Sequence, residues 1–136
     1  MKILRNIGAV FAGLLVGVVL NLLLISANAV LFPLPEGVDL FDPVGMSDYI
    51  KELPLYAFIL PILAHWSQAG VGGWIAAKLG GGRPVALSMI VGFLTLIGGV
   101  MNLLDLPFPL WMWLELPFYL LLSWGAGVLV KRRRES

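Results

Sequence analysis

Residues 7–32 read IGAVFAGLLVGVVLNLLLISANAVLF, a stretch that contains no charged side chain. An α-helix needs about 20 apolar residues to cross the roughly 30 Å hydrocarbon core of a bilayer, so this stretch predicts a membrane-spanning helix. Three more apolar runs follow, at about residues 54–78, 84–104 and 110–130. We therefore predict an all-α fold, a bundle of four transmembrane helices that forms a single integral membrane domain over residues 1–136.

The composition leaves no room for a separate soluble domain. Of the 136 residues, 60% are hydrophobic and only 12% are charged, whereas soluble domains have about 25% charged residues. The four spans consume most of the chain, and the longest remaining connection is a loop at 33–53. The second half of this loop has apolar residues at helical spacing, at Met46, Tyr49, Ile50 and Leu53. It predicts a short amphipathic helix lying flat in the membrane interface, with Asp42 as its N-cap.

The charges are sorted by sign between alternate connections. Eight of the nine basic residues lie at the N-terminus, in the loop after the second span or at the C-terminus: Lys2, Arg5, Lys78, Arg83 and residues 131–134. Seven of the eight acids lie in or beside the other two connections: Glu36, Asp39, Asp42, Asp48, Glu52, Asp105 and Glu115. Lys and Arg are retained on the cytoplasmic side of membrane proteins. We expect both termini in the cytoplasm, in a cell (inner) membrane.

The first span has two readings. Lys2 and Arg5 followed by an apolar run, with a small-x-small sequence at 27–29, could be a cleaved signal peptide. The apolar run is longer than the usual signal core of about 7 to 15 residues. Small residues also recur every fourth position, at Ala9, Gly13 and Gly17, ahead of Asn21. Such a stripe lets two helix backbones approach closely in lipid, which favours a permanent helix.

Two short matches suggest an internal repeat. Residues 17–23, GVVLNLL, match residues 98–104, GGVMNLL, and residues 52–56, ELPLY, match residues 115–119, ELPFY. Both matches fall at corresponding helix ends and in the same order, so we predict a duplicated helical hairpin related about the membrane normal. A helix starting at Pro117 would be too short to span by residue 130, so we expect the fourth helix to start near Leu110 and to be kinked at Pro117.

Polar side chains within apolar runs are the candidate functional residues, because each needs a partner in hydrocarbon. The candidates for a ligand or proton site are His65, Gln68, Asn21, Asn102, Glu115 and Tyr119. His65 lies close to mid-membrane, one helical turn before Gln68, and imidazole is the side chain that most readily changes charge near neutral pH. We expect an outward-open cavity floored by His65, Gln68 and Asn21. The alternative is that these side chains only link helices by hydrogen bonds.

Several classes of function are disfavoured. With no cysteine, the chain has no disulfide, reactive thiol or thiolate zinc site. One histidine with distant acids does not make the usual metal site, and His65 and Ser67 point about 200° apart on a helix, so they do not form a nucleophile–base pair. The acids of the 33–53 loop lack the spacing of a calcium loop. We predict no cofactor, no metal and no nucleic-acid partner, and we do not favour an enzyme.

A resemblance supports this architecture. The chain carries Pro35-Glu36-Gly37-Val38-Asp39, Ala64-His65 followed by Gly70 and Ala76-Ala77-Lys78, then Gly98-Gly99, Pro107 to Trp111 and Tyr119. In this order it resembles a group of small bacterial membrane proteins with four helices and no known function. The resemblance implies four spans in a bacterial membrane and supplies no activity.

Two functions remain open from the sequence. The first is a small membrane protein that binds or transports a small solute, an ion or a proton in a polar intramembrane pocket. Because four helices enclose little volume, transport would use a homo-oligomer. The second is a structural or partner-binding membrane subunit with no transport activity of its own.

Overall fold

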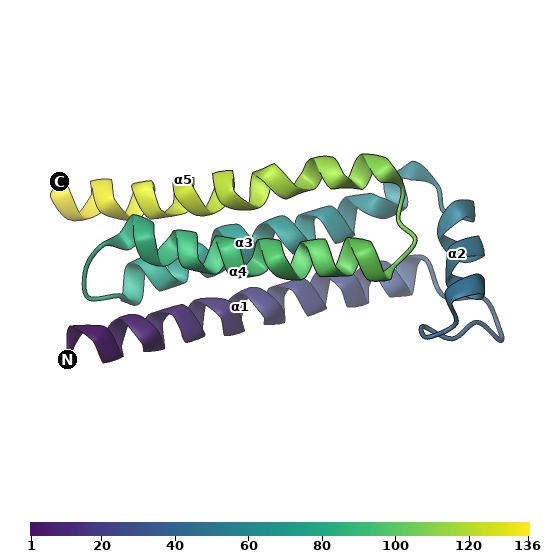
Figure 1. The fold of residues 1–136 in the computed structure, drawn as a ribbon, viewed down its shortest axis with the longest axis horizontal. Helices are drawn as coiled ribbons and strands as arrows, with labels where there is room; N and C mark the ends of the chain where they lie inside the picture. The colour runs from purple at the N-terminus through teal and green to yellow at the C-terminus, as the bar shows by residue number, and fades with distance from the viewer.

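The computed structural model describes residues 1–136 as an all-helical chain without strands (Figure 1). The elements are α1 (Lys2–Leu31), α2 (Pro43–Glu52), the 3-10 helix η1 (Leu55–Phe58), α3 (Ile59–Leu79), α4 (Pro84–Asp105), the 3-10 helix η2 (Leu110–Glu115) and α5 (Leu116–Glu135). The four long helices run side by side, and α2 lies across one end of them. Both termini and the α3–α4 turn lie at the opposite end.

The sorting of charge along the sequence becomes a sorting between the two ends of the bundle. The basic end, as we call it, carries both termini and the α3–α4 turn, and therefore eight of the nine Lys and Arg residues. The acidic end carries α2 and the α4–η2 connection. The bundle therefore has a strongly asymmetric charge distribution although its formal net charge is only +1.

Three of the four predicted spans have the length and apolar composition to cross a membrane: α1, α4, and the continuous segment Leu110–Glu135 made of η2 and α5. The fourth, α3, has 21 residues, so it is about 30 Å long, but it is less apolar. The reason lies in its position: α3 packs against α1, α4 and α5, and its buried face is mostly Ala and Gly. A helix surrounded by protein can carry small and polar residues that a lipid-facing helix cannot.

The small-residue stripe of α1 is a helix-packing face, as predicted, and it faces α3. Ala9, Gly13 and Gly17 are the buried residues of α1. A Cβ atom at Gly17 would lie 2.7 Å from the carbonyl oxygen of Gln68, and one at Gly72 would lie 2.7 Å from the carbonyl oxygen of Gly13. The two backbones are therefore in direct contact, which is how helices gain packing energy in a lipid environment.

Hydrogen bonds join the other long helices. The Ser88 hydroxyl on α4 donates to the Ser123 carbonyl on α5 over 2.5 Å, and the Ser123 hydroxyl donates to the Ala69 carbonyl on α3 over 3.2 Å. Both serines are fully buried. This chain of bonds fixes the relative positions of α3, α4 and α5.

Helix α2 forms where the amphipathic pattern predicts it, but its apolar face packs on protein. Met46 and Ile50 are buried against Phe58, Leu103 and Met112. The carboxylate of Asp42 accepts a hydrogen bond from the Val44 N–H over 3.1 Å, so the predicted N-cap is confirmed. Because α2 lies across the acidic end of the bundle, Met46 and Ile50 line part of a cavity there, together with exposed residues such as Leu40.

The phenol of Tyr49 ties α2 to α1. Its hydroxyl donates to the carbonyl oxygen of Phe32 over 2.5 Å. Burial raises the pKa of the Tyr49 phenol, so the hydroxyl keeps its proton and remains a donor at neutral pH. The C-terminal end of α1 and the short helix are therefore held together by a bond that depends on a protonated phenol.

The fourth long helix starts at Leu110 as predicted, but Pro117 does not kink a continuous α-helix. Residues 110–115 form η2, and Pro117 occupies the first turn of α5. A proline in the first turn lacks only an N–H that would have no intrahelical partner, so it does not disturb the helix. In place of a kink, the helix geometry changes from 3-10 to α just before Pro117. Pro54, in contrast, lies outside α3, because it immediately precedes the 3-10 helix η1.

The second repeat match joins residues in unlike surroundings. Tyr119 is fully buried, whereas Tyr56 is 66% exposed. Glu115 is buried at the end of η2, whereas Glu52 is exposed at the end of α2. Asn21 and Asn102, from the first match, do line the same cavities. Any duplication of a hairpin therefore rests on the first match.

Candidate functional site

A buried acid is the centre of the polar interior. The carboxylate of Glu115 is 1% exposed, and its Oε1 lies 3.0 Å from Nδ1 of His65. The same oxygen accepts a hydrogen bond from the Tyr119 hydroxyl over 2.9 Å. The indole Nε1 of Trp66 donates to the Glu115 backbone carbonyl over 3.3 Å. Three of the six predicted site residues, His65, Glu115 and Tyr119, therefore form one network.

The two carboxylate oxygens of Glu115 differ sharply. Oε1 has two partners, whereas Oε2 is buried and has none. A buried acceptor without a partner costs about 1 to 3 kcal/mol, so the site retains an unused capacity for hydrogen bonding. The His65–Glu115 pair can exist as imidazolium with carboxylate or as imidazole with carboxylic acid. These forms differ only in the position of one proton over 3.0 Å.

A second polar pair joins α1 to α3. The side-chain amide of Asn21 donates to Oε1 of Gln68 over 2.8 Å. Gln68 lies three residues after His65 on α3, on the same side of the helix. Asn102 of α4 completes the predicted set, since it lines the same cavities as Asn21 and His65.

These side chains border two cavities that lie end to end along the bundle. The first, here called the α2-side cavity, has a volume of about 340 Å³ and is mostly lined by apolar residues of α1, α2 and α3. The second, here called the mid-bundle cavity, has a volume of about 260 Å³. Asn21, His65 and Asn102 line both cavities, whereas Gln68 and Tyr119 line only the mid-bundle cavity. No Lys, Arg, Asp or Glu lines either one.

The mid-bundle cavity lies where two helices diverge. Its lining residues include Leu14 of α1 and Leu94 and Gly98 of α4, while α1 packs along α3 and has little contact with α4. Gly98 is exposed, and a Cβ atom added there would meet no other atom within 4 Å. The cavity is therefore bordered by a groove between α1 and α4.

The sequence reasoning missed Asn28 and Thr95. Asn28 lines the α2-side cavity with a buried Oδ1 that has no partner, and Thr95 lines the mid-bundle cavity while its hydroxyl donates to the Val91 carbonyl. Each lies seven residues from a predicted residue, Asn28 from Asn21 and Thr95 from Asn102. Seven residues are two helical turns, so this spacing was the signal that could have found both.

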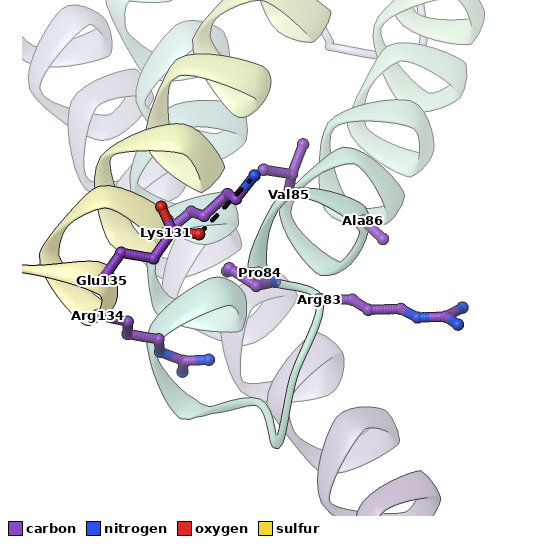
Figure 2. A pocket seen from close by; sticks show the side chains of 7 residues that line it. All are labelled: Arg83, Pro84, Val85, Ala86, Lys131, Arg134 and Glu135. Carbon is purple, nitrogen blue, oxygen red and sulfur yellow. Dashed lines mark ion pairs between the residues drawn. The ribbon is translucent and has the colours of Figure 1, made fainter.

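A larger hollow of about 630 Å³ lies at the basic end, between the start of α4 and the end of α5 (Figure 2). Its three cations do not converge. Lys131 pairs with Glu135 over 3.9 Å, and Arg83 extends away from the hollow. Arg134 donates to the carbonyl oxygens of Ala77, Lys78 and Gly80 at the end of α3. The hollow is therefore a by-product of helix-end packing, and we assign it no ligand.

Two acids of the 33–53 loop, Asp39 and Asp42, have local structural roles. Asp39 accepts from the Phe41 N–H over 3.2 Å, as Asp42 does from Val44. The structure contains no group of three or more His, Cys, Asp or Glu residues placed to hold a metal ion.

Comparison of the chain with protein-family models, with curated proteins and with solved structures finds no match to any of them.

Proposed function

We propose that this chain is a small multi-pass membrane protein that binds a small solute in its intramembrane cavities and transports it in a proton-linked manner. The observation that carries the proposal is the buried His65–Glu115 pair beside the cavities, with the second oxygen of Glu115 left without a partner. Ionisable residues within a membrane span are expensive and usually mark substrate or proton pathways.

The proposal includes four spans with both termini in the cytoplasm of a bacterial cell. Helix α3 is the fourth span, because its 21 residues match the others in length and three spanning helices surround it. The basic end faces the cytoplasm by the positive-inside rule. The resemblance to small bacterial four-helix membrane proteins supports the same arrangement, and the shared environment of Asn21 and Asn102 supports duplication of a hairpin.

Each residue of the site has a distinct task in this proposal. With Nδ1 directed at Glu115, His65 has Nε2 as its remaining ring nitrogen, and this atom contacts the solute in the cavity. Glu115 exchanges a proton with His65, and Tyr119 holds the carboxylate in place. Asn21, Gln68 and Asn102 supply neutral hydrogen-bonding groups. When Glu115 is a carboxylate and the neutral ring of His65 has its proton on Nδ1, Nε2 is an acceptor. A proton taken up from the cavity onto Nε2 makes this atom a donor, which links proton uptake to solute binding.

A second candidate has its own support. The Asn21–Gln68 and Ser88–Ser123–Ala69 bonds connect helices and would be sufficient for a purely structural role. In that case the chain is a membrane subunit that serves a partner and has no transport activity. Four helices enclose little volume, so the transport proposal implies a homo-oligomer, whereas the structural alternative implies a different partner chain.

Proton flux distinguishes the two candidates. We would reconstitute the protein in liposomes that contain a trapped pH-sensitive dye and would then acidify the outside by one unit. We expect the wild type to dissipate the gradient faster than protein-free liposomes, and Glu115→Gln to abolish the difference. Glu52→Gln is the matched control, because that carboxylate is exposed at the end of α2. If the wild type is no faster than protein-free liposomes, the structural alternative is the better account.

A further inference from the structure

We propose that the two cavities hold an uncharged amphiphile with a single hydrocarbon chain, which reaches them from the bilayer through the groove between α1 and α4. This inference rests on the proposed binding function and names the class of solute and its route.

The lining selects against charge. No Lys, Arg, Asp or Glu lines either cavity, and the one titratable ring that lines both, His65, is already paired with Glu115. An ionic group placed there would therefore lose its hydration without gaining an unpaired counter-ion. That loss costs many times more than burial of a hydroxyl or an amide that finds a hydrogen bond. The available partners beside the mid-bundle cavity are the carboxamide of Asn102 and the second ring nitrogen of His65. A neutral hydroxyl or amide matches these groups.

The polarity changes from one cavity to the next. The mid-bundle cavity is lined by Gln68, Thr95 and Tyr119, together with the three residues that it shares with its neighbour. The α2-side cavity is lined beyond those shared residues mainly by aliphatic and aromatic side chains, such as Ile25, Phe32 and Phe58. One molecule that occupied both would place a polar head beside His65 and an apolar chain toward α2. The volumes of about 340 and 260 Å³ together fall in the range of sites for drug-sized molecules.

The openings favour access from lipid. Helix α2 lies across the acidic end of the bundle (Figure 1), and its Met46 and Ile50 line the α2-side cavity. At that end the cavity is bordered by α2 and by the connection before it. The groove between α1 and α4 has no such cover, since Gly98 is exposed and an added Cβ atom would find open space. Moving an uncharged head group through hydrocarbon to the depth of the mid-bundle cavity costs much less free energy than moving a charged one.

Photolabelling tests the route. Protein in lipid nanodiscs would be labelled with a diazirine derivative of dodecanol, and the labelled peptides would be mapped by mass spectrometry. We expect label on the cavity segments of α1, α3 and α4, and about a tenfold reduction in Gly98→Phe, whose ring would fill the groove. The control is Gly125→Phe on α5, where an added Cβ atom also meets nothing within 4 Å. Equal labelling of Gly98→Phe and wild type would overturn the lateral route.

Competition tests the chemical class. Unlabelled dodecanol and dodecanamide should compete for the site, whereas dodecyl phosphate and dodecyltrimethylammonium should compete about tenfold less well or worse, since burial of their charge has no compensation in the lining. Equal competition by the charged probes would overturn the assignment of an uncharged head. The labelling and competition assays use no pH gradient. If they contradict the proposed ligand or its route, the proton-flux result for Glu115→Gln still tests the proposed function separately.

Discussion

Tyr119 and His65 are the two side chains that hydrogen-bond to the Glu115 carboxylate. Its hydroxyl lies four residues from Glu115 along the chain, and its ring fits against Gly99, where a Cβ atom would lie 2.9 Å from the hydroxyl oxygen. The tyrosine therefore closes the network on the side of α4. A phenylalanine would keep the ring and leave the carboxylate oxygen with one partner fewer.

We predict that Tyr119→Phe lowers the free energy of unfolding by about 1 to 3 kcal/mol, because a hydrogen bond to a buried carboxylate is lost. Thermal unfolding in detergent, followed by circular dichroism, measures the change. Tyr56→Phe is the control, since that ring is 66% exposed, and we expect it to remain within about 0.5 kcal/mol of wild type. Equal effects of the two substitutions would contradict the network.

At Tyr49 the prediction concerns pH. The folded-state pKa is raised above the ordinary value of 10.0 by burial, so folding favours the protonated phenol. Its contribution to stability is fully present below pH 10 and is lost as the pH rises through the raised folded-state value. The difference in ultraviolet absorbance between wild type and Tyr49→Phe, followed through an alkaline titration, should show one phenol that ionises above pH 10. A midpoint at or below 10 would contradict the burial of this phenol.

At the scale of the helix, the spacing of apolar and small residues predicted more than the identity of any one residue. The stripe at Ala9, Gly13 and Gly17 correctly predicted the face of α1 that packs on another helix, because helical periodicity is local. The 3-10 geometry of η1 and η2 was not predictable in this way. It depends on how the chain meets α2 and the bundle end, and these contacts join segments that are distant in sequence.

Close packing of α1 on α3 leads to a prediction at the same scale. Gly17→Leu should destabilise the protein by about 1 to 3 kcal/mol, because its Cβ atom would lie 2.7 Å from the Gln68 carbonyl oxygen and the helices must move apart. Gly8→Leu is the matched control on the same helix, since an added Cβ atom there meets nothing within 4 Å. Both changes gain the same helix propensity, so the difference in unfolding temperature reports the contact alone.

For the whole molecule, the sequence predicted which polar residues would meet but placed their depths only coarsely. A depth was predicted from the sequence only for His65, and the structure shows that Glu115 and Tyr119 are in the same hydrogen-bonded network. The fourth helix was expected as one α-helix, whereas Glu115 ends η2 just before α5 begins. That junction brings the carboxylate to His65, and a pattern of residue types carries no information about such a local change in helix geometry.

Membrane orientation is tested by cysteine labelling, because the chain contains no cysteine of its own. Glu36→Cys lies in the connection before α2, and Gly82→Cys lies in the α3–α4 turn. With intact cells opened only at the outer membrane, an impermeant maleimide should label Glu36→Cys and not Gly82→Cys. Labelling of both sites in unbroken membranes, or the reverse pattern, would contradict two cytoplasmic termini.

The contacts of Arg134 bear on the order of assembly during synthesis. The carbonyls at the end of α3 have no intrahelical partners, and Arg134, which supplies three of their bonds, follows Gly80 by 54 residues. Arg5 reaches the Leu79 carbonyl from the opposite side and is already present when α3 emerges. A nascent chain that holds α1 and α3 therefore carries a half-capped hairpin until the last turn of α5 has been synthesised. The end of α3 is completed only by a helix that is made after it.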